Sequence, residues 1–178
     1  MSLHADAVDV LAHWQAPEAE QERLRLSYAA HLAEHSDGVW RSCLPAHLTA
    51  GALVLSNDRR HALLNLHRKA HRWFHFGGHL EPADPTLAGA ALREATEESG
   101  LRGLVVEAEP LHLSRHSVDF CDPRGRVDHL DVRFLAFPGA QSTPVVSEES
   151  LDVRWWPVDE LPTDEPDMVE MIGLALRR

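Results

Sequence analysis

The residues best suited to chemistry are Glu94, Glu97 and Glu98, which lie in the segment from Thr86 to Ser99. An α-helix turns by about 100° per residue, so on a helix these three carboxylates fall within an arc of roughly 100°. Like charges at such spacings destabilise a helix by a few tenths of a kcal/mol per pair. A hard divalent cation offsets this repulsion, because Mg²⁺ takes carboxylate oxygens, keeps some of its waters and bridges to phosphates. The pattern therefore predicts a site for Mg²⁺ or Mn²⁺.

The neighbours of the glutamates support this prediction. Arg93 can orient a carboxylate through a charge-assisted hydrogen bond. Gly77 and Gly78 permit a sharp turn and a close approach of the backbone to a ligand. The alternative is a solvated acidic helix face with no ligand. The two glycines, the arginine and the closing Glu-x-Gly at Gly100 favour the metal site over that alternative.

The elements that must position these residues follow from the hydrophobic pattern. Alternating apolar segments bounded by turn residues predict strands, and segments with a 3.6-residue apolar stripe predict helices. The predicted strands are 47–56, 61–68, 73–76, 104–110, 111–120, 129–137 and 152–158, and the predicted helical segments are 4–36, 86–99 and 164–178. This order indicates an α/β layered domain over residues 43–178, preceded by a helical extension over residues 1–42.

Residues 77–101 resemble the Nudix box, a glycine and an acid followed by Arg-Glu-x-x-Glu-Glu-x-Gly and an apolar residue. The matching residues are Gly78, Glu81, Arg93, Glu94, Glu97, Glu98, Gly100 and Leu101. Two departures stand out: Asp84 replaces the usual mid-box glutamate, and one extra residue lies between Gly78 and Arg93. We expect a reshaped loop before an intact helix. The resemblance covers about residues 45–178.

The resemblance implies an α/β/α sandwich with a mixed β-sheet that hydrolyses a nucleoside diphosphate linked to another moiety. Glu94, Glu97 and Glu98, with the carbonyl of Gly77, would then hold one or more Mg²⁺ or Mn²⁺ ions. Such an ion lowers the pKa of a bound water, which attacks phosphorus. The general base varies within the family: Glu94, Glu98 and Glu149 are candidates, and the alternative for Glu149 is an exposed loop charge.

Histidines recur every four residues at His67, His71, His75 and His79. On a helix this spacing would make a zinc-binding face, but aromatic residues and two glycines in the segment favour strand and turn. We expect some of these imidazoles, His79 among them, to line a substrate cleft. The alternative is a set of scattered surface histidines.

Four further residues are candidates for substrate contacts. Arg68 and Lys69 lie within the histidine-rich segment. His129 and Asp131 share one face of their strand with Arg133. By the resemblance, the sheet holds the part of the substrate that carries no phosphate. A solvent-facing strand is the alternative for His129 and Asp131.

Composition narrows the class of partner. The chain has 178 residues, 44% of them apolar and 25% charged, as in ordinary folded proteins. Its formal net charge of −11 repels phosphate backbones, which argues against a nucleic acid polymer as partner. No apolar run approaches the roughly 20 residues that span a bilayer, and the first residues lack a signal-peptide pattern. We therefore expect a cytoplasmic protein that acts on a small molecule.

Functions other than hydrolysis find less support in the sequence. Neither a P-loop nor a dinucleotide-binding GxGxxG pattern occurs. A Nudix-fold module that binds a nucleotide without cleaving it is the main alternative, mildly favoured by the altered box loop. Isopentenyl-diphosphate isomerase chemistry is disfavoured, because neither Cys43 nor Cys121 has the expected Cys-His context. In the family, a residue beyond the box often marks the substrate subclass. Here that region is His116-Ser117-Val118, which does not indicate a substrate. Open points are the oligomeric state, a homodimer included, and whether the N-terminal helices form a lid, a dimer arm or a packing cap.

Overall fold

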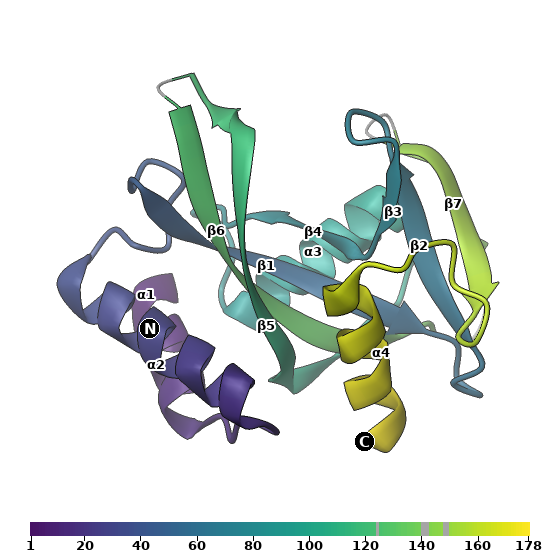
Figure 1. Cartoon of the computed structure of the whole chain (residues 1–178), viewed down its shortest axis with the longest axis horizontal. Helices are drawn as coiled ribbons and strands as arrows, with labels where there is room; N and C mark the ends of the chain where they lie inside the picture. Colours follow the sequence, from purple (N-terminus) through teal and green to yellow (C-terminus); the bar gives the residue numbers. More distant parts are fainter. Residues whose placement is uncertain (124, 140–142, 148–149) are drawn as a thin grey trace.

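The computed structural model describes the chain except residues 124, 140–142 and 148–149 (Figure 1). Its elements are α1 (Leu3–His13), α2 (Ala19–Glu34), β1 (Ala46–Leu55), β2 (His61–His67), β3 (Arg72–Phe74), β4 (Phe76–His79), α3 (Leu87–Ser99), β5 (Val105–Asp122), β6 (Gly125–Phe137), β7 (Ser150–Pro157) and α4 (Pro166–Arg177). The predicted mixed α/β class is confirmed.

One sheet organises the molecule. Its strands run in the order β3-β2-β1-β6-β5, while β4 pairs with β1 and β7 pairs with β2. Strand β1 pairs parallel to β6 and antiparallel to β2 and β4, so the sheet is mixed. Every residue of β1 is buried. The central strand therefore has protein on both faces, as the sandwich interpretation requires.

The two faces of β1 and β6 differ because side chains alternate along a strand. Leu48 and Ala50 of β1 and Val132 of β6 belong to a core that also includes residues of α1, α2 and α3. Leu53 and Leu135 belong to a second core with α4. Helices thus cover both faces of the sheet (Figure 1).

The N-terminal helices pack on the rest of the chain through buried hydrogen bonds as well as apolar contacts. Gln21 of α2 pairs with the backbone of Leu113, and the Tyr28 hydroxyl donates to the Ser114 carbonyl oxygen at 2.6 Å. In α1, the carboxylate of Asp6 accepts from the backbone N–H of Leu87 at 2.7 Å. These contacts are those of a packing cap. Among the described residues, no helix has the length and apolar character needed to cross a bilayer.

Two predicted divisions between strands were wrong, and β6 begins at Gly125, before the predicted start at residue 129. Segments 104–110 and 111–120 form one strand, β5, whose pairing with β6 shifts register on either side of Pro110. A proline cannot donate to a ladder, so irregular pairing accommodates it without ending the strand. Segment 73–76 divides between β3 and β4, with His75 at the break.

The central helix forms where the sequence predicts it. Helix α3 begins after Thr86, whose side chain accepts from the backbone N–H of Gly89 at 3.0 Å. It ends at Gly100, whose φ of 67° lies in the left-handed region that glycine adopts at little cost. The Nudix-box helix is therefore intact, and it packs against β1 and β4.

Candidate active site

The three glutamates of α3 lie beside strand β4. Glu98 is buried, and its Oε2 accepts from the backbone N–H of Gly77 at 2.9 Å. Glu94 lies against Gly78, where an added Cβ would come within 2.8 Å of the Glu94 Oε1 atom. The side chain of Glu97 is 61% exposed. The carboxylates thus extend from the buried side of the helix out to solvent.

Arg93 ties this carboxylate set to the preceding loop. Its Nη1 donates to Glu94 at 2.9 Å and to Glu97 at 3.3 Å. Its Nε and Nη2 bind both carboxylate oxygens of Asp84, at 2.9 and 3.1 Å, and Nη2 also donates to the His79 carbonyl oxygen. The hydrogen bond to Asp84 is the main cause that raises the pKa of Arg93 above its ordinary value. One guanidinium therefore fixes the loop, the end of β4 and the helix.

Asp84 has a role that sequence analysis missed. Its side chain is buried, and its Oδ2 accepts from the backbone N–H of Glu81 at 2.8 Å as well as pairing with Arg93. The residue that departs from the box pattern thus closes the loop on itself and anchors Arg93. The sequence shows that Asp84 lies shortly before Arg93. It does not show the conformation of the loop between them, so their contact could not be predicted.

Glycines let the backbone of β4 approach its neighbours. An added Cβ at Gly77 would lie 2.7 Å from the Gly51 Cα, and one at Gly51 would lie 2.6 Å from the Phe76 carbonyl oxygen. Gly51 and Gly77 are paired in the β1–β4 register. Bare backbone on both strands, together with Gly78 beneath Glu94, allows this close packing.

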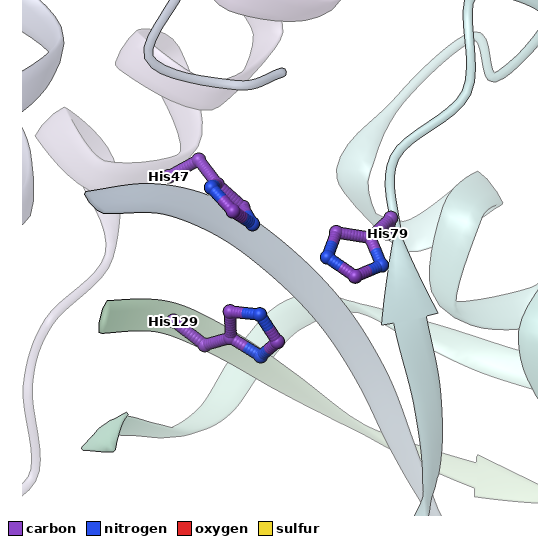
Figure 2. A group of neighbouring side chains, drawn as sticks. All are labelled: His47, His79 and His129. Atoms are coloured by element: carbon purple, nitrogen blue, oxygen red, sulfur yellow. The ribbon is translucent and has the colours of Figure 1, made fainter. Parts of the chain in front are cut away.

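Histidines gather on the other side of the β4 backbone. His47 of β1, His79 of β4 and His129 of β6 face one another (Figure 2), with ring centroids 5.0 to 5.2 Å apart. Burial and the neighbouring His47 lower the pKa of His79 to about 4. Burial, followed by His79 and His116, lowers the pKa of His129 to about 3. The imidazoles of His79 and His129 are therefore neutral near pH 7.

Asp131 is bound within the protein. Its Oδ1 accepts from the Thr49 hydroxyl at 2.9 Å, and its Oδ2 accepts from Arg133 Nε at 2.7 Å. His75 Nε2 lies 3.4 Å from the same Oδ2 atom. Burial opposes ionisation of Asp131, but the charge of Arg133 and the hydrogen bond from His75 outweigh it and hold its pKa well below the usual range. His129, Asp131 and Arg133 share one face as predicted, and that face is largely buried.

The structure separates the other predicted substrate residues from this group. Arg68 and Lys69 lie in the exposed turn after β2, a strand separated from β6 by β1. Arg68 donates to the Ser150 carbonyl oxygen at 2.9 Å, which joins the turn to β7. Glu149, a predicted catalytic residue, lies outside the described residues.

The four histidines that recur every four residues do not share one face. His79 joins the histidine group, whereas His75 contacts Asp131. His67 packs edge-on against Phe74, and His71 occupies a turn with a φ of 53°. His47 was missed as a candidate because no motif surrounds it. Only the pairing of β1 with β4 and β6 brings it to the other two.

Fold and site together define a layered α/β protein with a carboxylate-bearing helix against a glycine-rich strand. The family model described as NUDIX domain matches residues 45–174. The chain therefore belongs to the Nudix hydrolase family, and the predicted family membership is confirmed. Comparison with curated proteins found no match.

Solved structures share the fold at low identity. A Nudix-family hydrolase from Clostridium perfringens is 22% identical, with 74% of this chain and 98% of that chain covered and a TM-score of 0.57. A Caenorhabditis elegans Ap4A hydrolase in a binary complex is 18% identical, with 73% and 95% covered and a TM-score of 0.59. The NUDIX domain of Shewanella oneidensis NrtR complexed with ADP ribose is 21% identical, with 84% and 97% covered and a TM-score of 0.52. At these identities the likeness shows the fold alone.

Proposed function

We propose that this Nudix protein is a Mg²⁺- or Mn²⁺-dependent pyrophosphohydrolase that cleaves a nucleoside diphosphate linked to another moiety. The observation that carries the proposal is the placement of Glu94 and Glu98 directly against the glycine backbone of β4. A small-molecule substrate agrees with the acidic net charge, since a local cation would be needed to bring phosphate to the surface.

The donor set suits a hard cation. Glu94, Glu97 and Glu98 offer only carboxylate oxygens, and the carbonyl of Gly77 is the proposed backbone ligand. Oxygen ligands of this kind are those that Mg²⁺ and Mn²⁺ prefer. When bound, the ion would neutralise pyrophosphate charge and lower the pKa of a coordinated water.

The protein residues supply position and proton transfer. Arg93 restrains Glu94 and Glu97 through the hydrogen bonds described above, and Asp84 restrains Arg93. The Gly77 N–H restrains Glu98. Fixed carboxylates do not have to reorganise as the reaction proceeds, which lowers the barrier. Glu94 and Glu98 are the described candidates for the general base, and Glu149 remains a third.

The substrate would lie next to β4, near the glutamates of α3 and the histidine group. His79 and His129 are proposed to contact the part of the substrate that carries no phosphate. His79 suits this role because its backbone carbonyl contacts Arg93 while its side chain joins the histidine group. Arg68 and Lys69 remain proposed as residues that line the substrate cleft, and Asp131 remains proposed as a substrate contact. The division into an extension over residues 1–42 and a domain over residues 43–178 also remains a proposal.

The alternative is a Nudix-fold module that binds a nucleotide without cleaving it. The altered box loop was its main support. That support weakens here, because Asp84 provides Arg93 with a buried acidic partner despite the altered loop. The retained carboxylate set favours hydrolysis.

A hydrolysis screen with Mg²⁺ and with Mn²⁺ tests the proposal. The panel comprises nucleoside triphosphates, nucleotide sugars, ADP-ribose, NADH, coenzyme A and dinucleoside polyphosphates. We expect cation-dependent release of a nucleoside monophosphate or pyrophosphate from at least one member. No turnover of any member, together with tight calorimetric binding of one, would establish the binding module instead.

A further inference from the structure

We propose that His47, His79 and His129 form a second metal site, which binds one divalent transition metal ion through imidazole nitrogens. Zn²⁺ is the ion that matches this ligand set best. The site is distinct from the glutamate site of α3 in both residues and ligand chemistry. It does not depend on the proposed hydrolysis, and while an ion is bound His79 and His129 are its ligands and do not contact the substrate directly.

Strand pairing builds the site from three parts of the chain. His47 of β1 is the register partner of His129 in the parallel β1–β6 pair. His79 pairs with Thr49 in the antiparallel β1–β4 pair, two residues along β1 from His47. Residues two apart on a strand share a face. The three imidazoles therefore project from three adjacent strands onto one face, where they converge (Figure 2).

The distances fit a metal with a small adjustment. One ring nitrogen of each imidazole lies within 4.8 Å of one ring nitrogen of each of the other two. Around a tetrahedral zinc with Zn–N bonds of about 2.05 Å, two nitrogens are about 3.3 Å apart. Small side-chain rotations cover this difference. Three protein ligands leave the fourth position for water or an anion.

His47 has the outer contact expected of a metal ligand. It is fully buried, and its Nδ1 lies 3.2 Å from the backbone carbonyl oxygen of Cys43. A carbonyl only accepts hydrogen bonds, so Nδ1 carries the proton, and Nε2 is the ring nitrogen that would bind a metal. Metal-bound histidines usually make such a bond with their second nitrogen, which fixes the tautomer and the ring orientation.

The surroundings separate this site from the glutamates. The β4 backbone lies between them, because the His79 side chain joins the histidines while its carbonyl oxygen accepts from Arg93. Nearby charges are mixed: Asp131 favours a positive charge at His129, and Arg41 disfavours one at His79. Imidazole nitrogens suit a borderline ion such as Zn²⁺, whereas carboxylate oxygens suit Mg²⁺.

Titration of the full metal-free chain with Co²⁺, followed by Zn²⁺ competition, tests the proposal. We expect one equivalent of Co²⁺ to give the intense visible absorption of a four-coordinate ion, without a thiolate charge-transfer band, and Zn²⁺ to displace it. A thiolate band that disappears in Cys43→Ser would instead assign the ion to the neighbouring His35, Asp37 and Cys43 group and overturn the proposal.

Matched variants assign the ligands. His79→Gln and His129→Gln should each weaken Co²⁺ and Zn²⁺ binding at least about 100-fold, since loss of an outer contact alone costs about 10- to 100-fold. His13→Gln, at the exposed end of α1, should leave the affinity unchanged. Circular dichroism and thermal unfolding without metal verify that each variant folds. Unchanged affinity in both folded variants, or Co²⁺ binding that is weakly absorbing and lost only in Glu98→Gln, would overturn the proposal.

Discussion

The two sides of strand β4 are built in opposite ways. On one side, Asp84, Arg93, Glu94 and Glu98 come from one short stretch of chain. Arg93 binds the carboxylates of Asp84 and Glu94, and Glu98 accepts from the backbone N–H of Gly77. On the other, His47, His79 and His129 come from three strands far apart in the sequence. The first side carries fixed negative charge, and the second carries three imidazoles, of which His47 is buried and His79 and His129 are half-buried with lowered pKa values.

This difference shows how one strand can separate two kinds of chemistry. The glutamates depend on a helix that presents residues three and four apart on one face. The histidines depend on strand register, so a change in the pairing of β1 would disperse them. If the two sides are chemically independent, changes on one side should leave the metal preference of the other intact.

Removal of divalent cations should produce the largest effect. We expect a chelator to lower turnover of the best panel substrate by at least about 10³-fold, because metal catalysis supplies several kcal/mol of the barrier reduction. Added Mg²⁺ or Mn²⁺ should restore turnover, as measured by phosphate or nucleotide release. Full activity of protein shown to be metal-free would contradict the proposed metal site on the carboxylate side of β4.

Arg93→Lys tests whether the planar guanidinium holds the carboxylate side together. Lysine keeps the charge but cannot bind both oxygens of Asp84 while reaching Glu94. We expect turnover to fall about tenfold and the free energy of unfolding to fall by about 2 kcal/mol, since Asp84 is left buried with a poorer partner. Urea unfolding measures the second quantity. Arg23→Lys, in an exposed pair with Glu20, is the control and should change stability by less than about 0.5 kcal/mol.

Asp6→Ala tests how far the N-terminal helices support the carboxylate side. The variant leaves the Leu87 N–H at the start of α3 without its carboxylate acceptor. Loss of such a cap costs about 1–2 kcal/mol of unfolding free energy, which urea denaturation can measure. Asp9→Ala, at an exposed position of the same helix, serves as the control. Equal stability of the two variants would mean that α1 packs on the domain without supporting α3.

The buried residue His112 should make the stability of the protein depend on pH. Burial, followed by the charge of Arg133, lowers the pKa of His112 to about 3. The unfolded chain therefore binds a proton near pH 6.5 that the folded chain does not bind, so stability is lost as pH falls below that value. From pH 7 to pH 6 this one group should cost about 0.7 kcal/mol.

His112→Gln should remove that contribution from the unfolding free energy, measured in urea at both pH values. His13→Gln, which changes an exposed histidine, should retain the full pH dependence. An identical pH dependence in wild type and His112→Gln would show that His112 titrates normally in the folded protein.

The carboxylate side and most of the fold were predictable because their signals are local. Helical spacing places Glu94, Glu97 and Glu98 together, and Gly100 marks the helix end. Alternation along 129–137 correctly put His129 and Asp131 on one face. Each of these inferences needs only a few consecutive residues.

The remaining features depend on contacts between distant segments. The pairing of Asp84 with Arg93 depends on the loop shape, and the approach of His47 to His129 depends on parallel pairing across more than eighty residues. The cap that Asp6 provides to α3 requires α1 to dock on the domain. Sequence patterns describe which faces are buried, but they do not say which buried faces meet.

The most direct test of the account is turnover of the best panel substrate by Glu98→Gln at saturating Mg²⁺, beside wild type and Glu34→Gln. The Glu34 side chain is exposed near the end of α2, so this control should match wild type. We predict that Glu98→Gln loses about 10²- to 10³-fold in turnover while folding normally. Wild-type turnover in the folded Glu98→Gln variant would contradict the assignment of hydrolysis to the carboxylate side of β4.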